Sequence, residues 1–174
     1  MSVFGQESPG GSSTLMNEDY IRAGKFTLSE AGDVSKLSAY MANPNASNQA
    51  LRGLIYAADG ESNAPYTYKG ITNEVTLNAS TAAGWVDFAF ASPVSLAAGD
   101  YYLGVYGGAT GSQARLYYAD TGAYYYMDAA YPTPPSPWAG GSGPLDYALS
   151  INATYTPAAS GKPTHFCHYA SLRR

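Results

Sequence analysis

Aromatic side chains are the residues of this chain with the clearest capacity to bind a ligand. Six tyrosines fall within residues 116–132, in the string LYYADTGAYYYMDAAYP, and Trp138 follows a segment with four prolines at positions 132–137. Phenol and indole rings stack on sugars or fill partner pockets, and proline lowers the entropic cost of presenting them. The pattern predicts a binding face of Tyr124, Tyr126, Tyr131 and Trp138. The alternative for Trp138 is that it folds back as a lid over one end of the domain.

The triplet Asp120-Thr121-Gly122 matches the string found at the catalytic turn of aspartic proteases. Their chemistry needs two carboxylates that share one proton, supplied by two such turns or by a symmetric dimer. This chain has no second copy, and residues with strand-like alternation flank the triplet. We therefore interpret the triplet as the turn of a β-hairpin, whose tyrosines point alternately to both faces of the sheet.

Conventional catalytic and metal-binding side chains are scarce. His165 and His168, with the single cysteine Cys167 between them, lie close to the C-terminus, outside the predicted domain. This placement excludes a Ser-His-Asp or Cys-His site in the body of the domain. Three ligands fall short of the four that structural zinc takes. Paired carboxylates remain conceivable, but nothing selects among the aspartates, so we expect no enzyme, no metal and no cofactor.

The elements that position these residues are predicted to be strands. Charged residues make up only 13% of the chain, Gly and Pro occur 19 and 11 times, and apolar residues recur at alternate positions. This composition is typical of short strands joined by tight turns. Nine strands are predicted, at Ile21–Leu28, Val34–Met41, Ala50–Ala57, Glu74–Leu77, Gly84–Phe90, Asp100–Tyr106, Ala114–Ala119, Ala123–Met127 and Asp146–Thr156. The fold class is therefore all-β, an antiparallel β-sandwich of jelly-roll type.

The last predicted strand, Asp146–Thr156, has the clearest alternation. Odd-numbered positions are apolar or aromatic and even-numbered ones are small or polar. A strand with this pattern buries one face and exposes the other. The residues predicted to share the buried face are Tyr147, Leu149, Ile151, Ala153 and Tyr155.

We divide the chain into an N-terminal arm (1–19), the β-sandwich (20–156) and a C-terminal docking tail (157–174). Residues 1–156 carry 13 acidic and 6 basic side chains, whereas the tail carries three basic and no acidic ones. An acidic body argues against nucleic-acid binding. No apolar run is long enough for a membrane span, and the N-terminus has no secretory signal pattern. We therefore expect no membrane partner and synthesis in the cytoplasm without export by a signal peptide.

The tail is predicted to dock on another protein. Pro157 ends the last strand, and beyond it Phe166, Tyr169 and Leu172 are spaced by three residues, followed by Arg173 and Arg174. Exposed apolar side chains on a terminus too short to fold alone need a partner to cover them. The basic end would complement an acidic surface on a neighbouring subunit or a particle lattice. The alternative is that this segment is an expression-vector or frameshifted remnant.

Several strings resemble a β-sandwich module that occurs in bacterial extracellular proteins and in virion or tail proteins of actinobacterial phages. The resemblance rests on RAGKFTLSEAGDVSKLSAYM, ALRGLIYAADG, NEVTL and GWVDFAFASPVSLAAGDYYLGVYGG, within residues 20–156. These residues are mainly core and turn positions, so the resemblance implies a fold more directly than a function. The resemblance implies a binding or adhesion part without catalysis, of a kind that is often carbohydrate-binding-like.

The resemblance and the missing signal together favour a phage virion. We expect a non-enzymatic structural protein displayed on the particle, either as a capsid decoration or as a tail-attached binding module. Its partners would be a capsid or tail protein, with homo-oligomerisation and glycan binding as further expectations. The alternative is a carbohydrate-binding or adhesion module that stacks sugars on exposed tyrosine and tryptophan.

Overall fold

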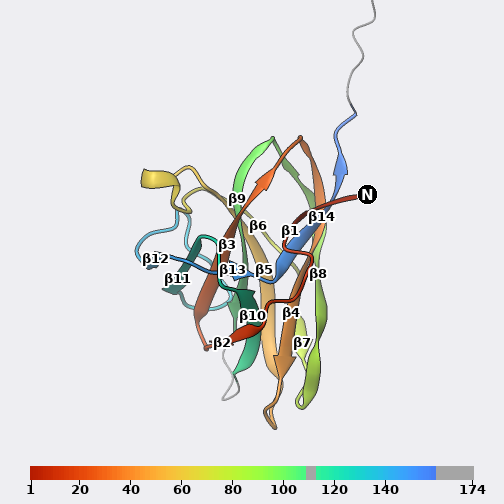
Figure 1. Ribbon diagram of the computed structural model, residues 1–174, viewed down its shortest axis with the longest axis vertical. Helices are drawn as coiled ribbons and strands as arrows, with labels where there is room; N and C mark the ends of the chain where they lie inside the picture. The colour runs from red at the N-terminus through yellow and green to blue at the C-terminus, as the bar shows by residue number, and fades with distance from the viewer. Residues whose placement is uncertain (109–112, 160–174) are drawn as a thin grey trace, which may run out of the picture.

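The computed structural model describes residues 1–108 and 113–159, which form two antiparallel β-sheets and one short 3-10 turn, η1 (Glu61–Asn63) (Figure 1). Sheet A consists of β1 (Ser2–Gly5), β2 (Ser12–Met16), β4 (Gly32–Asn43), β8 (Thr81–Leu96), β10 (Ala114–Ala119), β13 (Ala148–Leu149) and β14 (Ile151–Pro157). Sheet B consists of β3 (Tyr20–Leu28), β5 (Gln49–Ala57), β6 (Tyr68–Ile71), β7 (Val75–Leu77), β9 (Gly99–Gly107), β11 (Tyr124–Asp128) and β12 (Ser142–Leu145). The predicted all-β sandwich is confirmed, whereas its jelly-roll type stays a prediction.

The two sheets are organised differently: several strands of sheet A pair with β4, whereas sheet B is mainly a linear series of neighbouring strands. In sheet A, β4 pairs with β8 along much of its length and also with β14 and β10. In sheet B the strand order is β12-β11-β3-β9-β5-β6, with β7 also paired to β5. Strands far apart in sequence therefore lie next to each other, as β3 and β9 do over nine paired residues from Tyr20 to Leu28.

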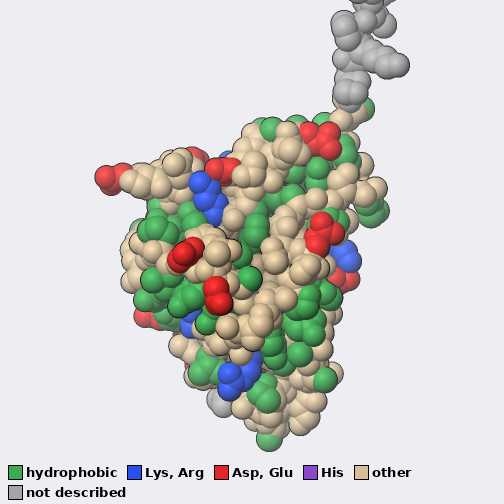
Figure 2. All heavy atoms as spheres, in the orientation of Figure 1, with side chains coloured by type: hydrophobic (Ala, Val, Ile, Leu, Met, Phe, Trp, Pro, Cys, Tyr) green, Lys and Arg blue, Asp and Glu red, His purple; other side chains and the backbone are tan. Residues whose placement is uncertain are grey.

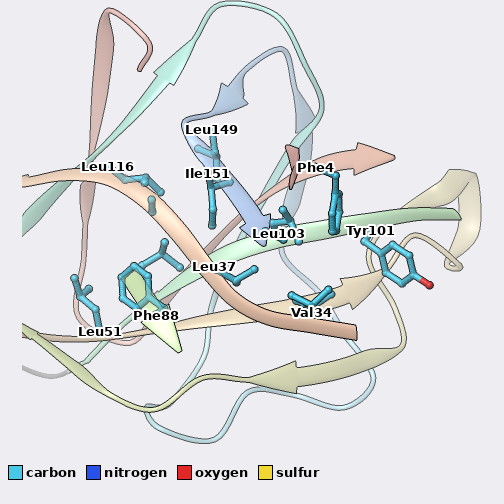
Figure 3. Packing of buried hydrophobic residues seen from close by; sticks show 14 of the residues in the cluster. Phe4, Val34, Leu37, Leu51, Phe88, Tyr101, Leu103, Leu116, Leu149 and Ile151 are labelled. Carbon is cyan, nitrogen blue, oxygen red and sulfur yellow. The ribbon is translucent and has the colours of Figure 1, made fainter. Parts of the chain in front are cut away.

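The main hydrophobic core contains side chains from both sheets. Leu37, Phe88 and Ile151 come from sheet A, and Leu51 and Leu103 come from sheet B; all five are fully buried. Figure 3 shows these side chains gathered in the space between the ribbons. Removing apolar surface of this kind from water contributes roughly 25 cal/mol per Å², which makes this core the main stabilising feature of the sandwich.

A second apolar cluster lies on the other face of sheet B, beneath the proline-rich segment 129–141. Tyr56 and Tyr106 from the sheet are buried there together with Trp138 from the segment. The Tyr56 hydroxyl donates to the Pro135 carbonyl at 2.5 Å, and the Tyr106 hydroxyl donates to the Ala129 carbonyl at 2.9 Å. Sheet B is therefore covered on both faces. We call this second cluster the closed aromatic layer.

The N-terminal segment differs from the predicted arm. β1 pairs with β14 and β2 pairs with β10, so residues from both strands form part of sheet A. Phe4 and Met16 are buried in the main core. The Gly- and Ser-rich composition suggested a lead-in, but the few apolar residues in the segment are spaced so that they reach the core. The compact unit therefore begins near Ser2 rather than at Tyr20.

The hairpin predicted around Asp120–Gly122 is wrong. β10 belongs to sheet A, where its partners are β2, β4 and β13, whereas β11 belongs to sheet B and pairs with β3 and β12. The triplet therefore connects the two sheets. Turn residues indicate where the chain reverses, but a short turn can join strands of one sheet or cross to the other. A hairpin and a connection between sheets therefore have similar local sequences, and they differ only in which strands pair in the folded protein.

The buried face predicted for the last strand is confirmed for four of its five residues. Leu149, Ile151, Ala153 and Tyr155 are all buried in the main core. The strand is interrupted at Ser150, which is itself buried, and its hydroxyl accepts from the Gly10 amide at 2.8 Å. Tyr147 lies before the interruption and is exposed.

The surface carries few charged side chains. On the face shown in Figure 2, acidic and basic groups are scattered among hydrophobic and uncharged polar atoms, without a basic stripe. Within residues 1–108 and 113–159, no helix is long and apolar enough to cross a membrane.

Candidate functional site

A cavity of about 350 Å³ opens between the two sheets and is lined mainly by tyrosines. β2, β10 and β13 border it from sheet A, and β3, β11 and β12 border it from sheet B. Leu145 and Leu149 add apolar surface. We call this cavity the tyrosine pocket and define it by Tyr20, Arg22, Tyr118, Tyr124, Tyr126 and Tyr147.

The tyrosine rings on sheet B form a stacked row. The centroids of Tyr20 and Tyr126 are 5.7 Å apart with an interplanar angle of 20°, and those of Tyr124 and Tyr126 are 5.6 Å apart with an angle of 26°. Tyr118 and Tyr147 form a tilted pair with centroids 4.5 Å apart. Because alternate side chains of a strand share one face, β11 presents Tyr124 and Tyr126 to the pocket together.

Arg22 is the one basic residue in the pocket lining. Its Nε donates to the Leu15 carbonyl at 2.8 Å, and its Nη1 donates to the Tyr124 hydroxyl. The guanidinium carbon lies 4.8 Å from the centroid of the Tyr20 ring, a distance typical of cation–π contacts. These contacts hold the guanidinium in place against the aromatic row.

The phenols of Tyr20 and Tyr124 keep their protons at neutral pH. Burial is the largest influence on Tyr124 and raises its pKa to about 12, although Arg22 acts in the opposite direction. Burial likewise raises the pKa of Tyr20, against the lowering effect of Arg22. A neutral phenol can both donate and accept a hydrogen bond, so the pocket offers hydroxyl donors beside one fixed positive charge.

A second hollow of about 320 Å³ adjoins the tyrosine pocket and shares Tyr20 and Tyr126 with it. Asp128 and Ser142 supply its polar side chains. Gly141 lies at its border with a φ of +88°, and a Cβ there would approach the Tyr126 carbonyl to 2.6 Å. The segment can therefore pass close to β11 only because this residue is glycine.

The structure brings together two of the four predicted binding residues. Tyr124 and Tyr126 both line the tyrosine pocket, although Tyr124 is only 3% exposed and forms part of its floor. Tyr131 and Trp138 instead lie in the closed aromatic layer. Trp138 is 6% exposed and meets Tyr56 edge-on at 5.1 Å between centroids. The folded-back alternative is thus the observed one, over the face of sheet B.

Tyr131 is held by charged neighbours. Its hydroxyl donates to Glu74 at 2.7 Å and accepts from the Arg52 Nε at 3.2 Å. Burial raises its pKa to about 12, and Glu74 acts in the same direction. These bonds fix the start of the proline-rich segment onto sheet B, so Tyr131 does not share a face with the pocket tyrosines.

Sequence reasoning missed Tyr20, Arg22, Tyr118 and Tyr147 as pocket residues. One local signal was present, because Tyr20 and Arg22 alternate with the apolar Ile21 and Ala23, which places the two on one face of a strand. Nothing local indicated that this face would meet β11.

The predicted docking residues of the tail lie outside the described residues. They are Phe166, Tyr169, Leu172, Arg173 and Arg174, and the His165–His168 segment also lies there. Within residues 1–108 and 113–159, no group of three or more His, Cys, Asp or Glu side chains is arranged to hold a metal ion.

No protein-family model matches the chain, and no curated protein matches it. The tyrosine pocket is therefore interpreted from its own geometry and chemistry.

Proposed function

We propose that this chain is a non-enzymatic binding protein whose tyrosine pocket holds a sugar ring. The observation that carries the proposal is the stacked row of Tyr20, Tyr126 and Tyr124, with Arg22 beside it, in a cavity of about 350 Å³. Aromatic faces suit the C–H surface of a pyranose, while phenol and guanidinium groups suit its hydroxyls. The cavity is of the size usual for small-molecule sites.

The chemistry of the lining supports binding rather than catalysis. The tyrosine pocket has no carboxylate, imidazole or thiol in its lining. Its buried phenol, Tyr124, has a pKa of about 12, too high for a general base at neutral pH. A pocket with these groups can orient a ligand through stacking and hydrogen bonds.

A glycan array tests the proposal directly. We expect the full-length protein to bind a restricted set of glycans, and Tyr126→Ala to lose at least tenfold in affinity because it removes the middle ring of the row. Trp85→Ala is the matched control, since Trp85 is 39% exposed and lies outside the pocket. Loss of binding in Trp85→Ala but not in Tyr126→Ala would show that the glycan binds on sheet A, at Trp85, and not in the tyrosine pocket. Absence of glycan binding by the wild-type protein would refute the proposal.

We further propose that the protein is displayed on a phage particle, attached to a capsid or tail protein. This part rests on the resemblance of residues 20–156 to virion modules and on the basic tail that follows an acidic body. Mass spectrometry and cryo-electron microscopy of purified particles test it. We expect the chain in the particle at fixed stoichiometry, and its absence from particles would refute the setting without affecting the glycan site.

A further inference from the structure

We propose, on the basis of the sugar-binding function above, that the ligand of the tyrosine pocket carries a carboxylate that Arg22 binds. The ligand class is then an acidic sugar, in which a uronic or sialic acid ring occupies the pocket. The inference comes from the hydrogen-bonding capacity of Arg22, the charges around it and a comparison with Arg52.

Arg22 lines the pocket and has N–H groups without a hydrogen-bond partner among the described residues. A guanidinium has five N–H groups. Within residues 1–108 and 113–159, two of them are used, by the Leu15 carbonyl and the Tyr124 hydroxyl. The remaining three include a pair on Nη1 and Nη2, which matches the two oxygens of a carboxylate in a bidentate arrangement.

Three of the other five basic side chains of residues 1–156 are paired with acids, whereas Lys69 and Arg115 form no ion pair with a carboxylate of the described residues. Lys25 is 2.9 Å from Asp100, Lys36 is 2.6 Å from Asp87, and Arg52 is 4.0 Å from Glu74, all measured between nitrogen and oxygen. Arg22 forms no such ion pair with any carboxylate in the described ranges, although acidic side chains outnumber basic ones there about twofold.

Arg52 shows how the same groups are arranged when a carboxylate is present. Its guanidinium carbon lies 5.9 Å from the Tyr131 ring centroid, and Glu74 both neighbours the guanidinium and accepts from the Tyr131 hydroxyl. The tyrosine pocket has the arginine and the tyrosines of this arrangement, but no acid in its lining. A ligand carboxylate at Arg22 would complete it.

The neighbouring groups suit one carboxylate rather than two. The nearby acid, Asp128, lines the adjoining hollow and not the tyrosine pocket. Tyr20 and Tyr126 line both the pocket and the hollow. The Tyr124 hydroxyl accepts from Arg22 and retains its proton at neutral pH, so it can donate to an anionic oxygen. A second ring in the hollow would meet Asp128 and should therefore be neutral.

An NMR titration of the full-length protein tests the inference with three probes: methyl β-D-glucuronide, the methyl α-glycoside of N-acetylneuraminic acid, and the neutral methyl β-D-glucoside. We expect one of the acidic sugars to bind at least tenfold more tightly than the glucoside, and the stronger of the two identifies the acid. Equal affinity for all three would overturn the inference but leave sugar binding intact. If none of the three probes binds, the inference is refuted, and the glycan array decides separately whether the proposed function also fails.

Variants separate a direct role of Arg22 from a structural one. Arg22→Gln should lower the ratio of acidic-sugar to glucoside affinity from at least tenfold to about one, because it removes the positive charge that faces the ligand carboxylate. Arg22→Lys keeps the charge but not the bidentate fork, so we expect intermediate selectivity. The control is Arg115→Gln, because Arg115 contacts Ser13 and lies outside the pocket. An unchanged preference for the acidic sugar in both Arg22 variants would also overturn the inference.

Discussion

Strand β11 separates two tyrosine-rich regions that use the same residue type differently. Tyr125 and Met127 face the closed aromatic layer, where Tyr125 meets Tyr102 edge-on at 5.4 Å. Tyr124 and Tyr126, on the opposite face of the same strand, line the open tyrosine pocket. In the closed layer, hydroxyls bond to backbone carbonyls and to Glu74, whereas the pocket leaves ring faces and Arg22 accessible. Aromatic content alone therefore does not identify a binding site; burial and hydrogen-bond partners do.

Alkaline pH should give the largest change, because it acts on several phenols of the closed layer at once. Burial raises the pKa of Tyr106 and Tyr131 to about 12, and that of Tyr56 and Tyr102 further. In the unfolded chain these groups titrate near pH 10. Since the folded-state pKa is higher, the resulting stability is fully present below about pH 10 and is lost as pH rises through about 12.

We therefore expect the urea midpoint to stay constant up to about pH 9 and then fall steeply, with phenolate absorbance rising in the same range as unfolding. A midpoint that is unchanged through pH 12 would show that the closed layer does not depend on neutral phenols.

Trp138→Ala should be the most damaging single substitution in the closed layer. Trp138 is 6% exposed, and its ring packs on Tyr56. Removal of a large buried aromatic side chain typically costs about 3–5 kcal/mol. Urea unfolding measures this loss, and Trp85→Ala, at a 39% exposed position, should cost far less. Equal losses in the two variants would mean that the proline-rich segment does not protect Trp138 in solution.

Gly141→Ala tests the junction between the two regions. Its φ of +88° and the close Tyr126 carbonyl make any side chain strained, so we expect a loss of roughly 1–3 kcal/mol in the free energy of unfolding. Gly84→Ala is the control, because a Cβ there meets no described atom within 4 Å, and the change should be neutral or stabilising. Thermal unfolding of both variants measures the difference. An unchanged stability of Gly141→Ala would contradict the close contact between residue 141 and the Tyr126 carbonyl.

The smallest expected effects come from removing single hydroxyls. Tyr131→Phe deletes the contacts with Glu74 and Arg52 and should cost about 1–2 kcal/mol. Tyr126→Phe keeps the stacked ring, and its hydroxyl has no hydrogen bond to another described residue, so stability should change by about 0.5 kcal/mol or less. Urea unfolding gives the free energy of unfolding of both variants. A larger loss in Tyr126→Phe than in Tyr131→Phe would mean that hydroxyls stabilise the tyrosine pocket more than the closed aromatic layer.

The sequence by itself determined the local structure of this protein. Alternation predicted most of the strands but not β1, β2, β6 and β12. It correctly assigned Leu149, Ile151 and Ala153 to one buried face. It also indicated that Tyr124 and Tyr126 point the same way, since alternate residues of a strand share a face. These properties depend only on neighbours along the chain.

Only the tertiary structure decided which strands meet and which rings remain accessible. The pocket joins Arg22 to Tyr124, which are 102 residues apart. Strands β10 and β11 enter different sheets although only four residues, 120–123, lie between them. Trp138 looked equally suited to display or burial, and it became buried because the face of sheet B beneath it is apolar. Non-local pairing is set by how much apolar surface the whole chain buries, and a short stretch of sequence does not contain that information.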